Sequence, residues 1–235
     1  MTIWYPASGF RSSYVGSLNN VGNYGFYWSA SPFGYNSYEA CRLAFYDDGD
    51  VYPSSRNCRA SGQSVRCVKE DSLSPAPQEY THQADLNVSS ATDLSSSGSA
   101  NCYIVSKSGT YKFKTVKGNS STPVGSVYVA ETLWETFGTS TTPSIGDLVS
   151  AITYEDGYIA FQTADTFKEG NAVIAAKDVN GKILWSWHIW FTDQPKEQVY
   201  YNNAGTMMDR NLGATSATPG DVGALGLLYQ WGRKD

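Results

Sequence analysis

From Cys102 onward, apolar and polar residues alternate in short runs that are separated by turn-forming residues. The runs are CYIVS, TYKFKTV, GYIAFQT and NAVIAAK, with Lys-Ser-Gly at 107–109 after the first and Asp156-Gly157 before the third. Helical periodicity is absent, whereas alternation within runs of this length is typical of half-buried strands. The pattern therefore predicts a series of short β-strands.

The clearest predicted hairpin joins NAVIAAK to KILWSWHIWF through Asn180-Gly181, a dipeptide that supplies the positive backbone angles of a tight turn. Alternation divides the second strand into two faces. One face holds Ile183, Trp185, Trp187, Ile189 and Phe191, and the other holds Leu184, Ser186, His188 and Trp190.

We interpret the first of these faces as the core of an immunoglobulin-like β-sandwich over residues 102–195. His188 is then expected at the surface or half-buried, rather than as a ligand. The alternative is that Trp185, Trp187 and Trp190 form a platform for stacking carbohydrate, but alternation places the first two inward. Core packing is therefore the favoured interpretation.

The remaining chain has three compositional segments. Residues 1–70 hold 14 of the 33 aromatic residues, and their cations are five Arg and a single Lys. Residues 71–101 contain eight Ser, two Pro and no Lys or Arg, which predicts an exposed linker. Residues 196–235 are Gly-rich, and a domain boundary is expected near Pro195.

Composition excludes several classes of function. A length of 235 residues suits two ordinary domains, and no apolar run approaches the roughly 18 residues of a membrane span. A net charge of -5 argues against binding nucleic acid, which requires clustered cations. The first ten residues lack the basic and apolar regions of a signal peptide, so the cellular compartment must be inferred from other features.

Neither a metal centre nor a catalytic site is expected. The four cysteines include no C-x-x-C pair, and His82 and His188 stand about a hundred residues apart, so zinc is not expected. Neither histidine adjoins a Ser or Cys motif typical of a hydrolase, so we expect no enzyme activity and no cofactor. Cys41 and Cys67 fall on predicted neighbouring strands, which leaves open either a disulfide or two buried thiols.

The run Asp47, Asp48, Gly49, Asp50 raises the question of calcium. It lacks the ligand spacing of a calcium loop, and no second acidic cluster accompanies it. We therefore predict a hairpin turn with a solvated acidic rim.

Three motifs in residues 3–69, "WYPASGFRSS", "GSLNNVGNYGFYWSASP" and "ASGQSVRCV", resemble the C-terminal half of C-type-lectin-like domains. The domains concerned occur in surface proteins of Bacteroides and their phages, including the Fibrobacter-type paralogous domain and target proteins of diversity-generating retroelements. "MMDRNLGA" and "LGLLYQWGRKD" are similar to the opening of the same domain. The resemblance thus implies partial lectin-like segments at 1–70 and 196–235, on either side of the linker and the sandwich, in a mainly β fold with some α+β character.

The order of the two segments is inverted relative to these relatives, and the middle of the domain, which carries a WR-P motif, is missing. A cut through a tandem array, a circular permutant and a fragment all remain open. The two partial segments could pair within one chain or between chains.

In the retroelement group, a fixed scaffold carries variable positions that recognise a ligand. The resemblance implies such a surface here, and a mixture of Tyr, Ser and Asn independently suits recognition, as in antibody paratopes. The alternative is that these are ordinary loop and turn residues. The predicted ligand-binding residues are Phe26, Tyr35, Asn36, Tyr38, Tyr46, Asp48, Asp50, Tyr52, Arg56 and Cys58. Their tyrosines are expected on one contiguous exposed face, with Trp28 and Val65 buried beneath.

The predicted function is that of an exported or cell-surface, adhesin-like protein that binds a protein or glycan ligand. The alternative is a structural fimbrial or stalk subunit that acts through self-assembly of its lectin-like segments.

Overall fold

The computed structural model describes residues 5–32, 38–66, 86–201 and 205–231. The chain divides into two compact units, of which the first combines residues 1–70 with 195–233 and the second comprises 71–194 and 234–235. The fold is mainly β, as the sequence predicts. In the described residues the helical elements of the two units are short 3-10 turns, η1 (Val88–Ser90) and η3 (Val222–Ala224).

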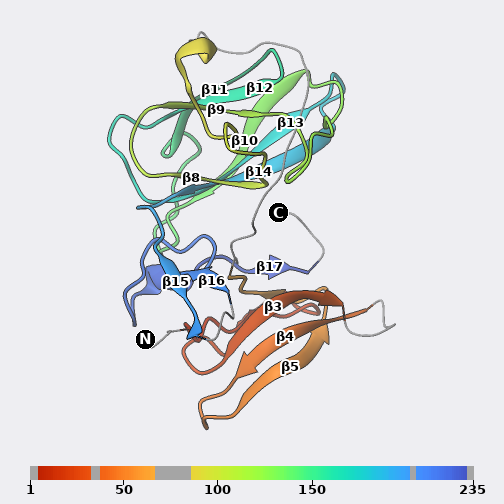
Figure 1. The fold of residues 1–235 in the computed structure, drawn as a ribbon, viewed down its shortest axis with the longest axis vertical. Helices are drawn as coiled ribbons and strands as arrows, with labels where there is room; N and C mark the ends of the chain where they lie inside the picture. Colours follow the sequence, from red (N-terminus) through yellow and green to blue (C-terminus); the bar gives the residue numbers. More distant parts are fainter. Residues whose placement is uncertain (1–4, 33–37, 67–85, 202–204, 232–235) are drawn as a thin grey trace. The chain divides into compact units, whose positions relative to one another are not determined.

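The second unit is a β-sandwich of two four-stranded sheets (Figure 1). One sheet has the order β10 (Val129–Thr136), β13 (Gly170–Lys177), β14 (Ile183–Phe191) and β8 (Cys102–Val105). The other has the order β11 (Val149–Glu155), β12 (Tyr158–Thr163), β9 (Thr110–Lys114) and β7 (Thr92–Asp93).

This strand order confirms the immunoglobulin-like sandwich. β10, β13 and β14 take the places of strands C, F and G, while β11, β12, β9 and β7 follow the order D, E, B, A. β8 extends the first sheet by pairing in parallel with β14. The short β7 departs from the usual pattern because it runs parallel to β9.

Aromatic side chains from both sheets fill the core between them. The ring of Phe113 in β9 lies 5.1 Å from the ring of Tyr103 in β8 and 5.1 Å from that of Trp187 in β14, measured between centroids. Phe113, Phe161 and Trp187 are fully buried. Burial of each large apolar side chain of this kind contributes roughly 1.5–3 kcal/mol to stability, so this cluster is a principal source of the unit's stability.

The predicted inward face of β14 is confirmed for the second half of the strand. Trp187, Ile189 and Phe191 belong to the core, and Trp185 packs at its margin. Ile183 differs from the prediction, because its side chain is 46 % exposed at the start of the strand.

The opposite face of β14 is buried too, which corrects the prediction for His188. His188 is 5 % exposed, because neighbouring strands provide hydrogen-bond partners for both of its ring nitrogens. Trp190 is fully buried as well. Neither Trp187 nor Trp190 can therefore stack on a carbohydrate at the surface.

Two turns that the sequence predicts join strands of the sandwich. Asp156 and Gly157 both have positive φ, 48° and 81°, and form the two-residue loop between β11 and β12. In the loop after β13, Gly181 has a φ of 78°, whereas Asn180 does not adopt a positive φ. The Asp178 carboxylate holds this longer loop by accepting hydrogen bonds from two of its backbone amides.

The predicted linker extends too far towards the C-terminus. Residues 67–85 lie outside the described residues, but 86–101 contribute η1 and β7 to the sandwich, and Leu94 packs against its core. Ser95 in this segment stabilises a turn, because its amide and its hydroxyl donate hydrogen bonds to Asp93 Oδ1 at 2.8 and 2.6 Å. A Ser-rich composition does not distinguish such turns from a linker.

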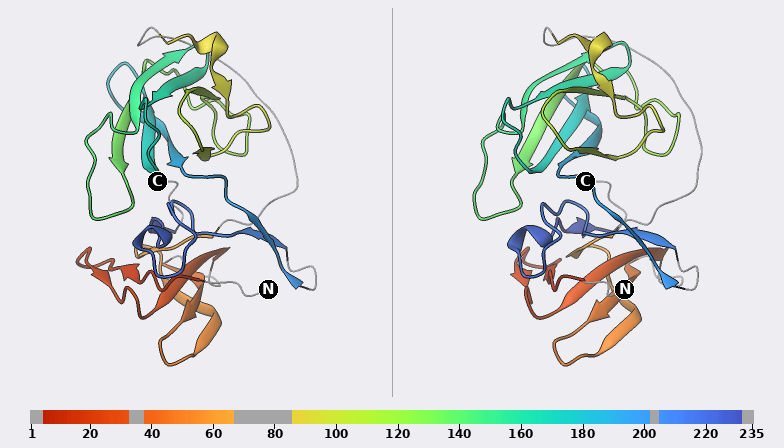
Figure 2. Two further views of the ribbon diagram at one scale, coloured as in Figure 1. Left: turned by 90° about the vertical axis from the view of Figure 1, so that its left-hand side faces the viewer. Right: turned by 60° about the vertical axis from the view of Figure 1, so that its left-hand side comes forward.

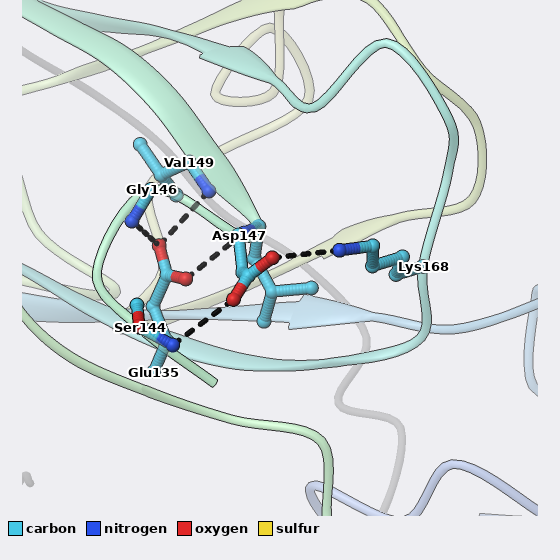
Figure 3. A network of polar contacts seen from close by, with 7 residues as sticks. Glu135, Ser144, Gly146, Asp147, Val149 and Lys168 are labelled. Atoms are coloured by element: carbon cyan, nitrogen blue, oxygen red, sulfur yellow. Dashed lines mark hydrogen bonds and ion pairs between the residues drawn. The ribbon is translucent and has the colours of Figure 1, made fainter. Parts of the chain in front are cut away.

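A buried carboxylate closes the loop between β10 and β11 (Figure 3). Glu135, at 8 % exposure, accepts hydrogen bonds from the amides of Leu148 and Val149 at 2.9 Å and, at 3.3 Å, from that of Gly146. Carboxylates form stronger hydrogen bonds than neutral acceptors, so these contacts fix the start of β11. On the outside of the loop, Asp147 accepts from Lys168 Nζ at 2.7 Å, which lowers the pKa of the Asp147 carboxyl.

In its described residues, the first unit contains three small sheets. One has the order β17 (Tyr229–Gln230), β6 (Gly62–Gln63), β1 (Phe10–Arg11) and β2 (Leu18–Asn19). Another consists of β3 (Gly25–Pro32), β4 (Glu39–Phe45) and β5 (Val51–Cys58), and the last of β15 (Glu197–Val199) and β16 (Thr206–Met208).

This unit is built from both ends of the chain. β17 pairs with β6, and Figure 2 shows the blue C-terminal segment beside the red and orange N-terminal strands in both views. Asn211 Nδ2 donates to the hydroxyl of Tyr27 at 3.2 Å, and the hydroxyls of Tyr5 and Tyr200 lie 2.8 Å apart. The two partial segments that the sequence predicts thus pair with each other within this chain.

Candidate functional site

The β4–β5 hairpin carries most of the described ligand-binding residues that the sequence predicts. Its tip is held by backbone hydrogen bonds between Tyr46 and Asp50 and between Gly49 and Tyr46, at 3.0 and 3.2 Å. Gly49 has a φ of 93°, a conformation that a side chain would disfavour. Asp48 Oδ1 accepts from the amide of Asp50 at 3.0 Å, so the acidic run forms a closed turn, as predicted.

A column of aromatic rings leads from the interior of the unit to this tip. The rings of Phe26, Tyr46 and Tyr52 follow one another edge to face, with centroids 5.9 and 5.7 Å apart. Exposure rises along the column, from 3 % at Phe26 through half-buried Tyr46 to 48 % at Tyr52. Tyr24 packs against Tyr46 at 4.9 Å. Such edge-to-face contacts favour one arrangement of the rings.

A cation supports the buried end of this column. The guanidinium of Arg42 lies 4.2 Å from the centroid of the Phe26 ring, and its Nε donates to the hydroxyl of Ser55 at 3.4 Å. Burial lowers the pKa of Arg42, an effect that the nearby Tyr46 partly offsets. Arginine over an aromatic face adds a cation–π attraction, so the base of the column is held from two sides.

The exposed end of the column combines hydroxyl and carboxylate groups. The Tyr52 hydroxyl donates to Asp50 Oδ2 at 3.0 Å, and this bond raises the pKa of Tyr52. Asp48 and Asp50 are exposed. We call Tyr46, Asp48, Asp50 and Tyr52 the hairpin surface. It presents aromatic rings beside hydrogen-bond acceptors.

Three other predicted residues lie at the far end of the sheet. Tyr38 is 79 % exposed. Arg56 forms an ion pair with Glu39 at 3.7 Å, and Glu39 is opposite Cys58 in the strand register. Phe45, at the hairpin end of β4, is six residues from Glu39, or roughly 20 Å along an extended strand. The prediction of one contiguous tyrosine face is therefore wrong for Tyr38.

The remaining predicted positions are placed as follows. Phe26 is buried, so its inclusion among surface contacts is wrong: it supports the hairpin surface from below. Tyr35 and Asn36 lie outside the described residues. Trp28 is 9 % exposed, as expected for scaffold, whereas Val65 is only half-buried.

Two residues near the C-terminus form hydrogen bonds with β3. The sequence-based prediction of the site did not include them. Trp28 Nε1 donates to the carbonyl of Tyr229 at 3.0 Å, and Trp231 Nε1 donates to the carbonyl of Ser29 at 2.9 Å. The guanidinium of Arg59 lies 4.2 Å from the Trp231 ring centroid. The resemblance of the YQWGR stretch to the opening of a lectin-like domain was the available signal for this role.

Two further kinds of feature are absent from the described residues. They contain no group of three or more His, Cys, Asp or Glu that could hold a metal ion. No helix among them is long and apolar enough to cross a membrane. Cys41 is a half-buried thiol, and its predicted partner Cys67 lies outside this part of the chain, as does His82.

Comparisons with family models, with curated proteins and with solved structures found no match for this chain. The resemblance to C-type-lectin-like surface proteins therefore stays a prediction.

Proposed function

We propose that this chain is a ligand-binding protein of the cell surface or the extracellular space, and that the hairpin surface is its recognition site. The observation that carries the proposal is the Tyr52–Asp50 pair, which is exposed at the end of a fixed aromatic column. The expected ligand is a protein or a glycan. We infer no catalytic role for this surface.

Preorganisation supports this assignment. Ordering a flexible side chain at an interface costs roughly 0.5–1.5 kcal/mol, and that cost reduces affinity. The ring of Tyr52 is already positioned by Tyr46, and its hydroxyl is already bonded to Asp50. A ligand that contacts this surface therefore finds its main aromatic contact in place, as in matured paratopes.

The chemistry of the surface favours a ligand rich in hydrogen-bond donors. Asp48 and Asp50 present acceptor oxygens, while Tyr46 and Tyr52 offer ring faces and edges. Sugar hydroxyls with their C–H faces, and peptide amides or cationic side chains, match both kinds of group.

A binding screen followed by substitution tests the proposal. The labelled full chain is applied to a glycan array and to a displayed library of random peptides, and selected binders are measured by biolayer interferometry. We expect Tyr52→Ala to weaken binding about tenfold or more, because binding energy concentrates in a few aromatic anchors. Tyr14→Ala is the matched control, since Tyr14 is 95 % exposed in the same unit and lies in the turn between β1 and β2, which belong to a different sheet from the hairpin.

Binding that survives both Tyr52→Ala and Asp50→Asn in a folded protein would contradict the proposal. The absence of any binder, together with concentration-dependent self-association in sedimentation, would instead support the structural subunit that acts through assembly.

A further inference from the structure

Three polar side chains meet on the outer face of the sheet that contains β14. Cys102 Sγ lies 3.3 Å from His188 Nδ1, and His188 Nε2 lies 2.8 Å from Asn171 Oδ1. The three residues come from β8, β14 and β13, and Cys102 is the direct cross-strand partner of His188. The sheet therefore aligns a thiol, an imidazole and an amide that are far apart in sequence.

Strand alternation explains why all three point the same way. Tyr103, Ala172 and Ile189, which adjoin them in sequence, belong to the hydrophobic core. Because successive side chains on a strand point to opposite faces, Cys102, Asn171 and His188 share the outer face.

The hydrogen bonds determine which nitrogen of His188 carries the proton. The Asn171 Oδ1 atom is an acceptor only, so His188 Nε2 must donate to it. In a neutral imidazole the other nitrogen, Nδ1, then has a lone pair, and it faces the thiol. Burial lowers the pKa of His188 from 6.5 to about 4, so the ring is neutral near pH 7. Nδ1 of the neutral His188 ring therefore faces the Cys102 thiol as a proton acceptor, at 3.3 Å from Sγ.

The three residues differ in exposure. His188 is 5 % exposed and Asn171 is fully buried, whereas Cys102 is only half-buried on β8, the edge strand of its sheet. Cys102, the residue that would form a covalent bond, is therefore the most exposed of the three.

We propose that Cys102 is a nucleophile activated by His188, with Asn171 as the positioning residue, and that this centre accepts acyl groups from activated esters or thioesters. A nucleophile, a base and a third group that orients the base form the arrangement used for this chemistry. The activity is separate from ligand recognition by the hairpin surface.

Acyl transfer to Cys102 requires no further reactant. Cys102 Sγ forms a bond to the acyl carbon, and the thiol proton moves to His188 Nδ1. The bond between that carbon and the leaving oxygen or sulfur breaks, and the leaving group takes the electron pair. The proton then passes from His188 to the leaving group. The product is a thioester on Cys102.

The experiment uses p-nitrophenyl acetate as the acyl donor and the full chain as the protein. Release of p-nitrophenolate gives the rate, and peptide mapping by mass spectrometry assigns the acetyl group to individual cysteines. Cys41 and Cys58, which are also half-buried thiols, serve as internal references. We expect Cys102 to react at least about tenfold faster than either, since general-base assistance typically contributes about 100-fold or more.

Substitutions separate an activating role from a merely structural one. His188→Gln is expected to slow acetylation of Cys102 about 100-fold and to leave the reference cysteines unchanged. Asn171→Leu is expected to slow it as well, whereas Asn171→Asp, which keeps an acceptor for Nε2, should restore the rate.

The pH profile of the unaltered chain provides a test that does not depend on variants folding. With His188 as base, the Cys102 rate stays level from about pH 5.5 to 8, whereas direct attack by a thiolate rises about tenfold per unit towards the ordinary thiol pKa of about 8.5. A tenfold rise per unit at Cys102 would overturn the proposal. So would a Cys102 rate no greater than that of Cys41 and Cys58, or an unchanged rate in folded His188→Gln.

Discussion

The buried carboxylate of Glu135 offers the sharpest test of how the sandwich is held together. Its two oxygens accept three backbone hydrogen bonds at the start of β11, and two of the donors belong to Leu148 and Val149, which are 1 % and 4 % exposed. Glu135→Ala removes every one of these acceptors at once. The amides of Leu148 and Val149 then lose their acceptor.

The size of the destabilisation follows from the two buried amides that lose their hydrogen-bond acceptor. A buried amide left without a partner costs roughly 1–3 kcal/mol, so the amides of Leu148 and Val149 together account for about 2–6 kcal/mol. The longer bond from Gly146, at 3.3 Å, adds little. We therefore expect Glu135→Ala to destabilise the sandwich by about 4 kcal/mol. Glu135→Gln should cost about half as much, because it keeps one acceptor oxygen.

Thermal unfolding measures the total effect, and hydrogen exchange by mass spectrometry locates it. For a domain of about this size we expect Tm to fall by roughly 10 °C or more and exchange to accelerate at residues 144–149. The matched control is Glu131→Ala on the same strand, whose carboxylate pairs with Lys177 at the surface and should contribute less than about 1 kcal/mol. A Glu135→Ala protein that melts and exchanges like the Glu131→Ala control would refute the reasoning.

Three further results are expected. Trp187→Ala should cost about 3–5 kcal/mol in urea unfolding, because the side chain is fully buried, and an unchanged midpoint would show that its assigned face is wrong. Because burial lowers the pKa of His188 to about 4, the unfolded chain binds more protons between about pH 6.5 and 4. The free energy of unfolding should therefore decrease by about 3 kcal/mol as the pH falls from about 6.5 to 4, and His188→Gln should flatten this pH dependence. Tyr52→Ala should shift Tm by less than roughly 2 °C while it weakens binding, and a large fall in Tm would mean that the ring is structural.

Local chemistry allowed most of the sandwich to be predicted. Asp156-Gly157 specifies a two-residue turn because both residues tolerate positive φ, and alternation identified the inward position of Trp187. Both signals lie within a few residues of the feature that they predict. The same is true of the acidic turn at Asp48 and Asp50.

The features that were missed depend on partners far away in the sequence. His188 was expected near the surface because nothing beside it indicated that Asn171 and Cys102, 17 and 86 residues away, would satisfy its nitrogens. Phe26 was assigned to the surface by its residue type, whereas the fold places it beneath Tyr46. The Ser-rich stretch before Cys102 had the composition of a linker, and only packing distinguishes it from ordered turns.

The pairing of β6 with β17 has a consequence for how the protein is made. Trp28 in β3 donates its hydrogen bond to Tyr229, a residue 201 positions later in the chain. On the ribosome, the N-terminal strands therefore emerge long before their partners, whereas the intervening sandwich can fold as soon as its own strands are out. Contacts of such high sequence separation also form slowly. The unit that carries the hairpin surface is thus expected to be completed last, after a period in which Trp28 is exposed on the nascent chain and accessible to chaperones.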